Sequence, residues 1–224
     1  MGSRFLSLDN LQGQEYGYEL AYRLACEKLA DIDIKQQCLK SDAGYQVIDS
    51  RQVITLGYLN RLYKITLPDI EVALKDSEEP VPLRDKILVL HYFIQAKGTP
   101  VSKKLKAYKE LPGGELYLPT FFKRAIKPIV DHFGEEPHRL LDIAGMLGGR
   151  KADYGDMAVT INAFSRVPVT LVLWGGDEEL APQGNILFDN TVSDYLTTDD
   201  INMLCGNIAW KLVGLLKAQD DSHS

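Results

Sequence analysis

Two stretches of the chain alternate apolar and polar residues with the period of a β-strand. Residues 45–68 are rich in Val, Ile, Thr and Tyr and are interrupted by turn residues at 49–50 and 59–60, which predicts an antiparallel meander. Residues 156–174 show the same alternation on both sides of a turn near 165–166, which predicts a hairpin or two adjacent strands.

Other stretches repeat apolar residues at the spacing of an α-helix. The clearest lies near the C-terminus, where Ile201, Leu204 and Ile208 share one face. Thr197 and Asp200 have the spacing of a capping box at its start. Similar patterns predict helices over residues 16–32, 83–97, 120–133 and 138–148, with Pro128 expected to kink the third of them.

The predicted strands occur before and after a helical middle part, without the regular strand–helix–strand alternation of parallel sheets. The sequence therefore predicts an α+β fold in which an antiparallel sheet of about five to six strands packs against several helices. We expect one domain over residues 9–217, with flexible termini at 1–8 and 218–224.

The composition limits the kinds of partner. Of the 224 residues, 31 are acidic and 25 are basic, which gives a net charge of −6. This balance disfavours nucleic acid as a partner, because binding a phosphate backbone requires an uncompensated basic surface. No apolar run approaches the roughly 20 residues of a membrane span. The three widely spaced cysteines suit a reducing compartment, so we expect a cytoplasmic protein.

The sequence lacks the common catalytic and cofactor motifs. The glycine group at 145–156 has the wrong spacing for a phosphate loop, and Arg150-Lys151 is not followed by Ser or Thr. The cysteines lie far apart and a proline separates His132 from His138, so we predict no metal site.

An acidic turn follows the second predicted strand pair. Asp177, Glu178 and Glu179 come shortly after Trp174, and Asp189 follows three apolar residues. Adjacent carboxylates are stable in a solvated turn, whereas their burial would require a proton or a cation. Because apolar residues occur on both sides, we expect one of the three adjacent acids to face a pocket, and a fully solvated turn is the alternative.

A second candidate region follows two glycines at 113–114. Tyr117, Phe121 and Arg124 recur at i, i+4 and i+7, which places aromatic and cationic side chains along one side of a helix. We predict that this side meets the acidic turn and Trp174, and that together they line the principal pocket. Alternatively, both aromatic residues fill the core while Arg124 forms a surface ion pair.

His91 lies on or beside the apolar stripe of the helix predicted at 83–97. An imidazole there could act as an acid, a base or an axial ligand, and Tyr92 and Phe93 could wall a flat cofactor. The alternative is a hydrogen-bonded histidine in the core.

Four phrases occur in a characteristic order, namely ILVLHYFIQAKGTPVS, ELPGGELYLPTFFKRAIKPIVDHFG, YGDMAVTINAFSRVPVTLVLWGGDEE and NILFDNTVSDYLTTDDI. Through them the chain resembles, over most of residues 16–215, the uncharacterised family called domain of unknown function 3786. The resemblance implies a protein of anaerobic bacteria and archaea. It also implies that some relatives are joined to an iron–sulfur module of the kind found in corrinoid one-carbon metabolism. This chain has no cysteine motif for such a cluster.

These observations leave three functional hypotheses. The first is a module that binds a small molecule or cofactor, with a corrinoid or haem as the most specific candidate and an iron–sulfur or corrinoid protein as its partner. The second is an enzyme that uses Asp156, Asp177 and Glu178 in acid/base chemistry, while Arg124 or Lys123 binds an anionic substrate. The third is a purely structural subunit with a broad apolar surface and no deep pocket.

Overall fold

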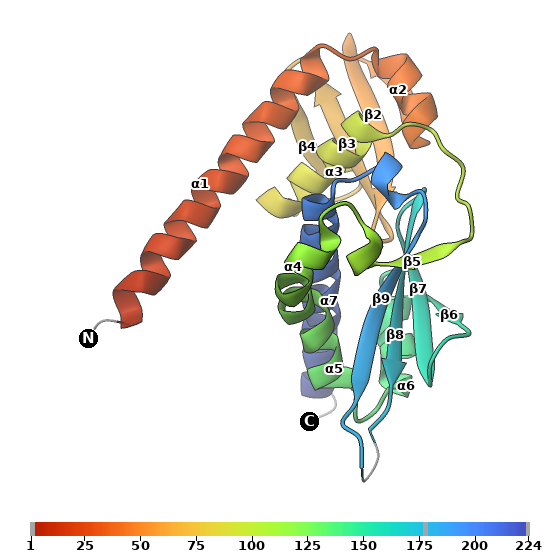
Figure 1. The fold of residues 1–224 in the computed structure, drawn as a ribbon. Coiled ribbons are helices and arrows are strands. Elements are labelled where there is room, and N and C mark those ends of the chain that lie inside the picture. Colours follow the sequence, from red (N-terminus) through yellow and green to blue (C-terminus); the bar gives the residue numbers. More distant parts are fainter. Residues whose placement is uncertain (1–2, 177–178, 223–224) are drawn as a thin grey trace. The chain divides into compact units, whose positions relative to one another are not determined.

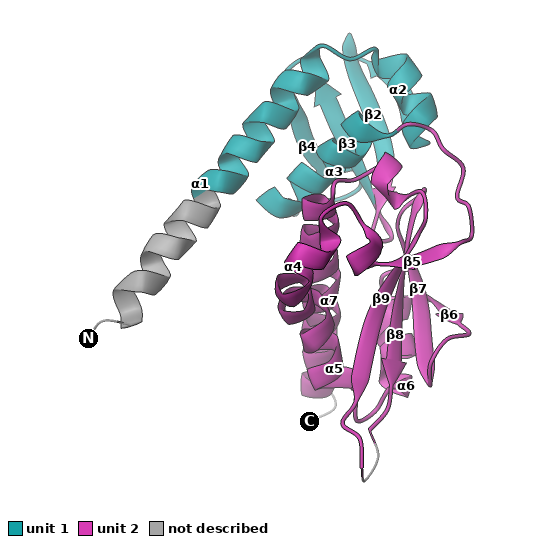
Figure 2. Ribbon diagram, in the orientation of Figure 1, with its two compact units in different colours: residues 1–56, 62–96 teal, residues 57–61, 97–224 magenta. Residues whose placement is uncertain are grey.

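The computed structural model describes residues 3–176 and 179–222, and for residues 3–15 it describes only the backbone. The chain divides into two compact units (Figure 2). Unit 1 comprises residues 1–56 and 62–96, and unit 2 comprises residues 57–61 and 97–224. Each of these units has a sheet and helices of its own.

Unit 1 is built around a four-stranded antiparallel sheet with the strand order β1-β2-β3-β4 (Figure 1). Its strands are β1 (Gly44–Ile48), β2 (Arg51–Tyr58), β3 (Arg61–Leu67) and β4 (Glu71–Leu74). The predicted meander is confirmed. Residues 49–50 and 59–60 have positive φ angles, as tight two-residue hairpin turns require, and they stand where the sequence predicts breaks.

The two faces of this sheet differ in exposure. Ile54 and Leu56 of β2 and Ile65 of β3 are at most 3% exposed, whereas the residues between them are only half-buried. The buried face belongs to the core of unit 1, to which α3 adds Leu90 and other apolar side chains. The helices of this unit are α1 (Ser3–Ala30), α2 (Ile34–Ser41) and α3 (Leu83–Gln95), and the last two are tied together by the Gln37 side chain, which donates to the carbonyls of Phe93 and Ala96.

Unit 2 contains a five-stranded antiparallel sheet with the order β5-β9-β8-β7-β6 (Figure 1). Its strands are β5 (Leu105–Ala107), β6 (Arg150–Ala152), β7 (Met157–Phe164), β8 (Val167–Trp174) and β9 (Gln183–Asp189). The predicted pairing of residues 156–174 is confirmed, because Ile161 lies opposite Val169 and Val159 lies opposite Leu171. All four side chains are at most 1% exposed, so this face of the sheet is part of the core.

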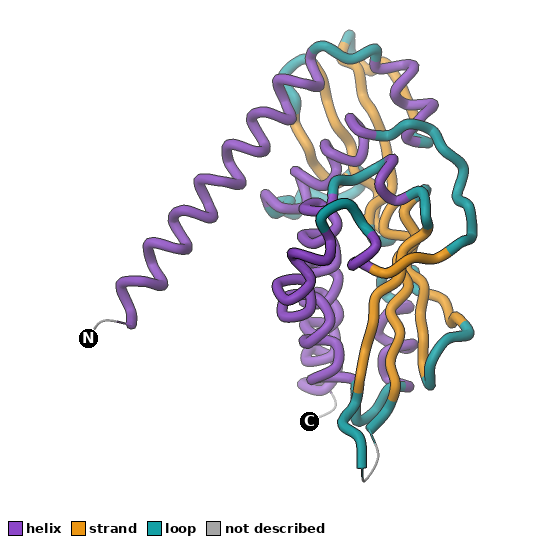
Figure 3. The backbone as a smooth tube through the Cα atoms, viewed as in Figure 1, coloured by secondary structure: helices purple, strands orange, loops and turns teal. Residues whose placement is uncertain are grey.

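A nearly continuous helix packs along this sheet (Figure 3). It consists of α4 (Gly114–Phe121), a π-helical turn (Phe122–Ile126) and α5 (Lys127–Phe133). The helix begins before the predicted residue 120, and its distortion lies before Pro128 rather than at it. Pro128 occupies the first turn of α5, where proline fits the helical backbone, while Pro119 lies inside α4 and supplies no backbone donor.

The C-terminal helix α7 (Thr198–Ser222) begins with the predicted capping box. The Asp200 backbone N–H donates to Thr197 Oγ1 at 3.2 Å, and the Thr197 backbone N–H donates to Asp200 Oδ2 at 3.1 Å. A shorter helix, α6 (His138–Gly145), contacts β7. Helix extends to residue 3 in α1 and to residue 222 in α7, beyond the predicted domain limits.

The predicted α+β class is confirmed, with the strands divided between sheets of four and five rather than placed in one sheet. The additional strands β4, β5, β6 and β9 are short or lack clear alternation, which is why the sequence pattern did not reveal them. In the part of the chain that the structure describes, no helix is long and apolar enough to cross a membrane.

Candidate functional site

Phe121 and Tyr117 have different surroundings although they lie one helical turn apart. Phe121 is completely buried and stacks on Tyr108 with ring centroids 3.8 Å apart, and its ring centroid lies 6.3 Å from that of Phe188 in β9. Tyr117 is 48% exposed and stands at the rim of a hollow. Phe121 is thus a core residue of unit 2, whereas Tyr117 remains accessible to a ligand.

The predicted acidic turn connects β8 and β9. Asp177 and Glu178 lie outside the described residues, while Glu179 and Trp174 are exposed. This turn lies beside the end of α5, because a Cβ atom at Gly134 would come within 2.6 Å of the Pro182 side chain.

The two predicted regions lie at opposite ends of β9. Trp174 pairs with Gln183, the first residue of β9, whereas Phe121 contacts Phe188 near its last residue. Five residues of strand span about 17 Å, and Tyr117 lies a further helical turn from the acidic end. The structure therefore does not bring Trp174 and Tyr117 together in one pocket.

Arg124 is exposed on the π-helical turn, and its backbone carbonyl lies against α7. Ten helical residues separate it from Gly134, which corresponds to about 15 Å. Arg124 and the described part of the acidic turn thus do not form the predicted site.

Two predicted carboxylates have structural contacts instead. Asp156 is exposed, and its Oδ2 accepts the backbone N–H of Gly175 at 2.9 Å. Asp189 is 1% exposed and accepts five hydrogen bonds from three residues, namely Ser102, Lys103 and Thr191. Burial opposes ionisation of Asp189, but the hydrogen bonds from Thr191 and Ser102 outweigh it and hold its pKa below the ordinary value.

His91 lies half-buried in α3, but its neighbours are not available to a flat cofactor. Tyr92 and Phe93 are 1% and 0% exposed, and the Tyr92 hydroxyl donates to the Ser41 carbonyl at 2.8 Å. His91 lines none of the hollows described below. These surroundings do not fit a tetrapyrrole stacked beside a His91 axial ligand.

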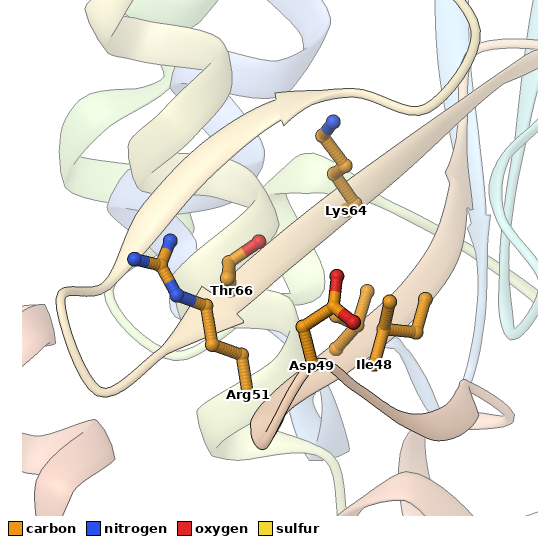
Figure 4. A pocket seen from close by; sticks show the side chains of 6 residues that line it. Ile48, Asp49, Arg51, Lys64 and Thr66 are labelled. Carbon is orange, nitrogen blue, oxygen red and sulfur yellow. The ribbon is translucent and has the colours of Figure 1, made fainter.

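A hollow of about 560 Å³ lies on the half-exposed face of the unit 1 sheet (Figure 4). It is lined by Ile48, Asp49, Arg51, Val53, Lys64 and Thr66. Strand geometry explains this grouping. Ile48 pairs directly with Arg51, so the two share a face, and alternate residues of each strand project on the same side.

The polar side chains that line this hollow come from β2, β3 and the β1–β2 turn, and its apolar lining consists of Ile48 and Val53. Arg51 from β2 and Lys64 and Thr66 from β3 project on one side of the sheet, and Asp49 extends from the β1–β2 turn (Figure 4). Within the described residues, the side chains of Arg51 and Lys64 make no hydrogen bond and no ion pair. Two cations and one carboxylate leave this surface with a net positive charge.

Two other hollows lie in unit 2, and one of them has Tyr117 at its rim beside the start of α7. Its volume is about 360 Å³, and the hydroxyl groups of Thr197 and Thr198 in its lining already have partners. The Thr198 hydroxyl donates to the Pro112 carbonyl at 2.8 Å, and Thr197 bonds Asp200. This hollow therefore offers fewer uncommitted polar groups than the hollow in unit 1.

Metal ligands do not converge in the described residues, where no group of three His, Cys, Asp or Glu side chains could hold a metal ion. Sequence reasoning did not select Arg51 or Lys64. A signal was available for Lys64, which stands between the buried residues Tyr63 and Ile65 of the predicted meander, whereas Arg51 lies next to a turn among exposed residues.

A family model described as a domain of unknown function matches residues 36–210. The chain belongs to the DUF3786 family. No curated protein and no solved structure matches it. The DUF3786 match includes both sheets, so the hollow in unit 1 and those in unit 2 lie within the family region.

Proposed function

We propose that this DUF3786 protein is a small-molecule-binding module and that the hollow on the unit 1 sheet is its ligand site. The observation that supports the proposal is the pair of cations, Arg51 and Lys64, whose side chains have no partner among the described residues and lie beside the apolar side chains of Ile48 and Val53. Guanidinium and ammonium groups bind carboxylates and phosphates, and the Thr66 hydroxyl adds a further hydrogen bond.

The ligand class that fits is a small anion with an apolar part. The charged end would contact Arg51 or Lys64, which stand at different sides of the hollow (Figure 4), while Ile48 and Val53 would cover the apolar part. Asp49 would accept a hydrogen bond from a hydroxyl or amino group of the ligand. A haem or corrinoid carries acidic or amide groups on a large ring and remains a candidate in this proposal, at this surface rather than at His91.

The resemblance to relatives joined to iron–sulfur modules supports an iron–sulfur or corrinoid protein as the partner in this proposal. The compartment we propose is the cytoplasm, which is supported by three cysteines that are all free thiols.

Acid/base catalysis receives less support from the geometry. The pKa values of Asp189 and Asp194 are lowered by hydrogen bonds that these carboxylates accept from neighbouring residues, which indicates a structural role. Asp156 is exposed, and its Oδ2 accepts the backbone N–H of Gly175. Acid/base chemistry by two carboxylates needs separated pKa values in one cleft. The enzyme hypothesis therefore has less support than the binding hypothesis.

The proposal is tested by titrating the protein with acetate, hexanoate, inorganic phosphate, haem and cobalamin while following its melting temperature. We expect hexanoate or a larger anion to bind more tightly than acetate, because it also covers apolar surface. The double variant Arg51→Gln/Lys64→Gln should weaken binding at least tenfold. The exposed Lys28 of α1 provides the control, since Lys28→Gln should leave binding unchanged. Equal binding by both variants would contradict the proposed site.

A further inference from the structure

The two sheets have edge strands, and β1 differs from the others. β4, β5 and β6 have four, three and three residues, and each contains or adjoins several charged side chains. β1 is five residues long, and its sequence GYQVI contains no charge and no proline. Short length and charge are the usual protection of an edge against pairing with another chain, and β1 is the longest of the four edge strands and has no charged residue within it.

The side chains of β1 are also accessible. Val47 is 61% exposed and Ile48 is 50% exposed, and the only intramolecular strand paired with β1 among the described residues is β2. Tyr45 is half-buried, with the Lys35 ammonium 5.7 Å from its ring centroid. An exposed apolar edge of this kind is suited to the addition of a further strand.

We infer that β1 pairs with the β1 strand of a second copy of this chain. The sequence of the strand is self-complementary in an antiparallel arrangement centred on Gln46. Gly44 would lie opposite Ile48, Tyr45 opposite Val47, and Gln46 opposite Gln46 of the second copy. No like charges would meet within these five pairs, and each Tyr45 would gain an apolar cross-strand neighbour.

This arrangement has twofold symmetry and joins the two four-stranded sheets into one sheet of eight strands. It also affects the hollow described above. Residues directly opposite share a face, so Gln46 of the second copy would project on the same side as Ile48, next to the lining of the hollow. The dimer itself does not depend on the proposed ligand, since it rests on the edge strand alone.

The position of Gln46 on the twofold axis gives a specific test. Gln46→Glu places two carboxylates opposite each other, and Gln46→Lys places two ammonium groups there. Each variant alone should weaken dimerisation at least about fivefold, whereas an equal mixture of the two should recover association through opposite charges. Gln46 is exposed, so neither change should unfold the monomer.

Gln52→Glu is the matched control, because it makes the same chemical change at an exposed residue of β2, which is not an edge strand. Sedimentation velocity of the full chain up to about 1 mM measures each dissociation constant. We expect the wild type and Gln52→Glu to dimerise alike, and the mixture to associate better than either Gln46 variant. A monomeric wild type, a Gln46→Glu variant that dimerises like wild type, or a mixture without recovery would each overturn the inference.

Discussion

Replacement of Asp189 by Asn should destabilise unit 2 strongly. Four of the five hydrogen bonds to this carboxylate end on Oδ1, and the fifth joins Oδ2 to the Lys103 backbone N–H at 2.6 Å. Asparagine has one carbonyl oxygen, which can replace Oδ1, and an NH2 group in place of Oδ2. This NH2 group would face the Lys103 backbone N–H, so that two donors would meet. The Lys103 backbone, whose φ is 61°, would then lose the contact that holds this unfavourable conformation.

The expected loss follows from these contacts. A hydrogen bond to a charged group contributes about 1.5–3 kcal/mol, and a buried donor left unsatisfied costs a similar amount. We therefore expect Asp189→Asn to lower the free energy of unfolding by about 2–3 kcal/mol, which corresponds to roughly 4–12 °C in melting temperature for a chain of this size. Thermal unfolding measures the change.

The exposed Asp153 supplies the control, because Asp153→Asn alters charge equally and should change stability by less than about 0.5 kcal/mol. The pH dependence provides a second check. The folded state lowers the pKa of Asp189, so its contribution is complete above the unfolded pKa of about 3.9 and is lost as pH falls through the folded pKa. The difference between wild type and Asp189→Asn should shrink below about pH 4. If Asp189→Asn is as stable as Asp153→Asn at pH 7, the reasoning is refuted.

Two glycines in helices should respond oppositely to alanine. A Cβ at Gly114 would come 2.0 Å from the Tyr108 carbonyl oxygen, so Gly114→Ala should cost about 3 kcal/mol or more, whereas Gly145 has open space and Gly145→Ala should add about 0.5–1 kcal/mol. Urea midpoints measure both, and equal effects would contradict the structure. The cysteines should also differ: burial raises the pKa of all three thiols, that of Cys38 to about 11, but Cys38 and Cys205 are buried whereas Cys26 is only half-buried. In native protein at pH 8, Ellman's reagent should react first with Cys26, and a fast phase that persists in Cys26→Ser would show that another thiol is accessible.

The sequence predicts most elements with strong periodicity, and it predicts the capping of α7, because local spacing determines these features. It does not reveal how strands distribute between sheets, since β9 became recognisable as a strand only through its pairing with β8. For the site, residue type alone did not indicate which side chains are available to a ligand. Phe121 and Asp189 suggested a pocket, but tertiary contacts place Phe121 in the core and saturate the Asp189 carboxylate with donors. Strand pairing places Arg51 and Lys64 around the same hollow, which sequence spacing alone does not display.

The most direct measurement of the central claim is an amide NMR titration with hexanoate or a larger carboxylate that binds in the thermal assay. The account predicts saturable shifts concentrated at the residues lining the unit 1 hollow, among them Arg51, Val53 and Lys64, and their loss in Arg51→Gln/Lys64→Gln. Saturable shifts that instead concentrate around Tyr117 and the start of α7, or that survive unchanged in the double variant, would contradict it.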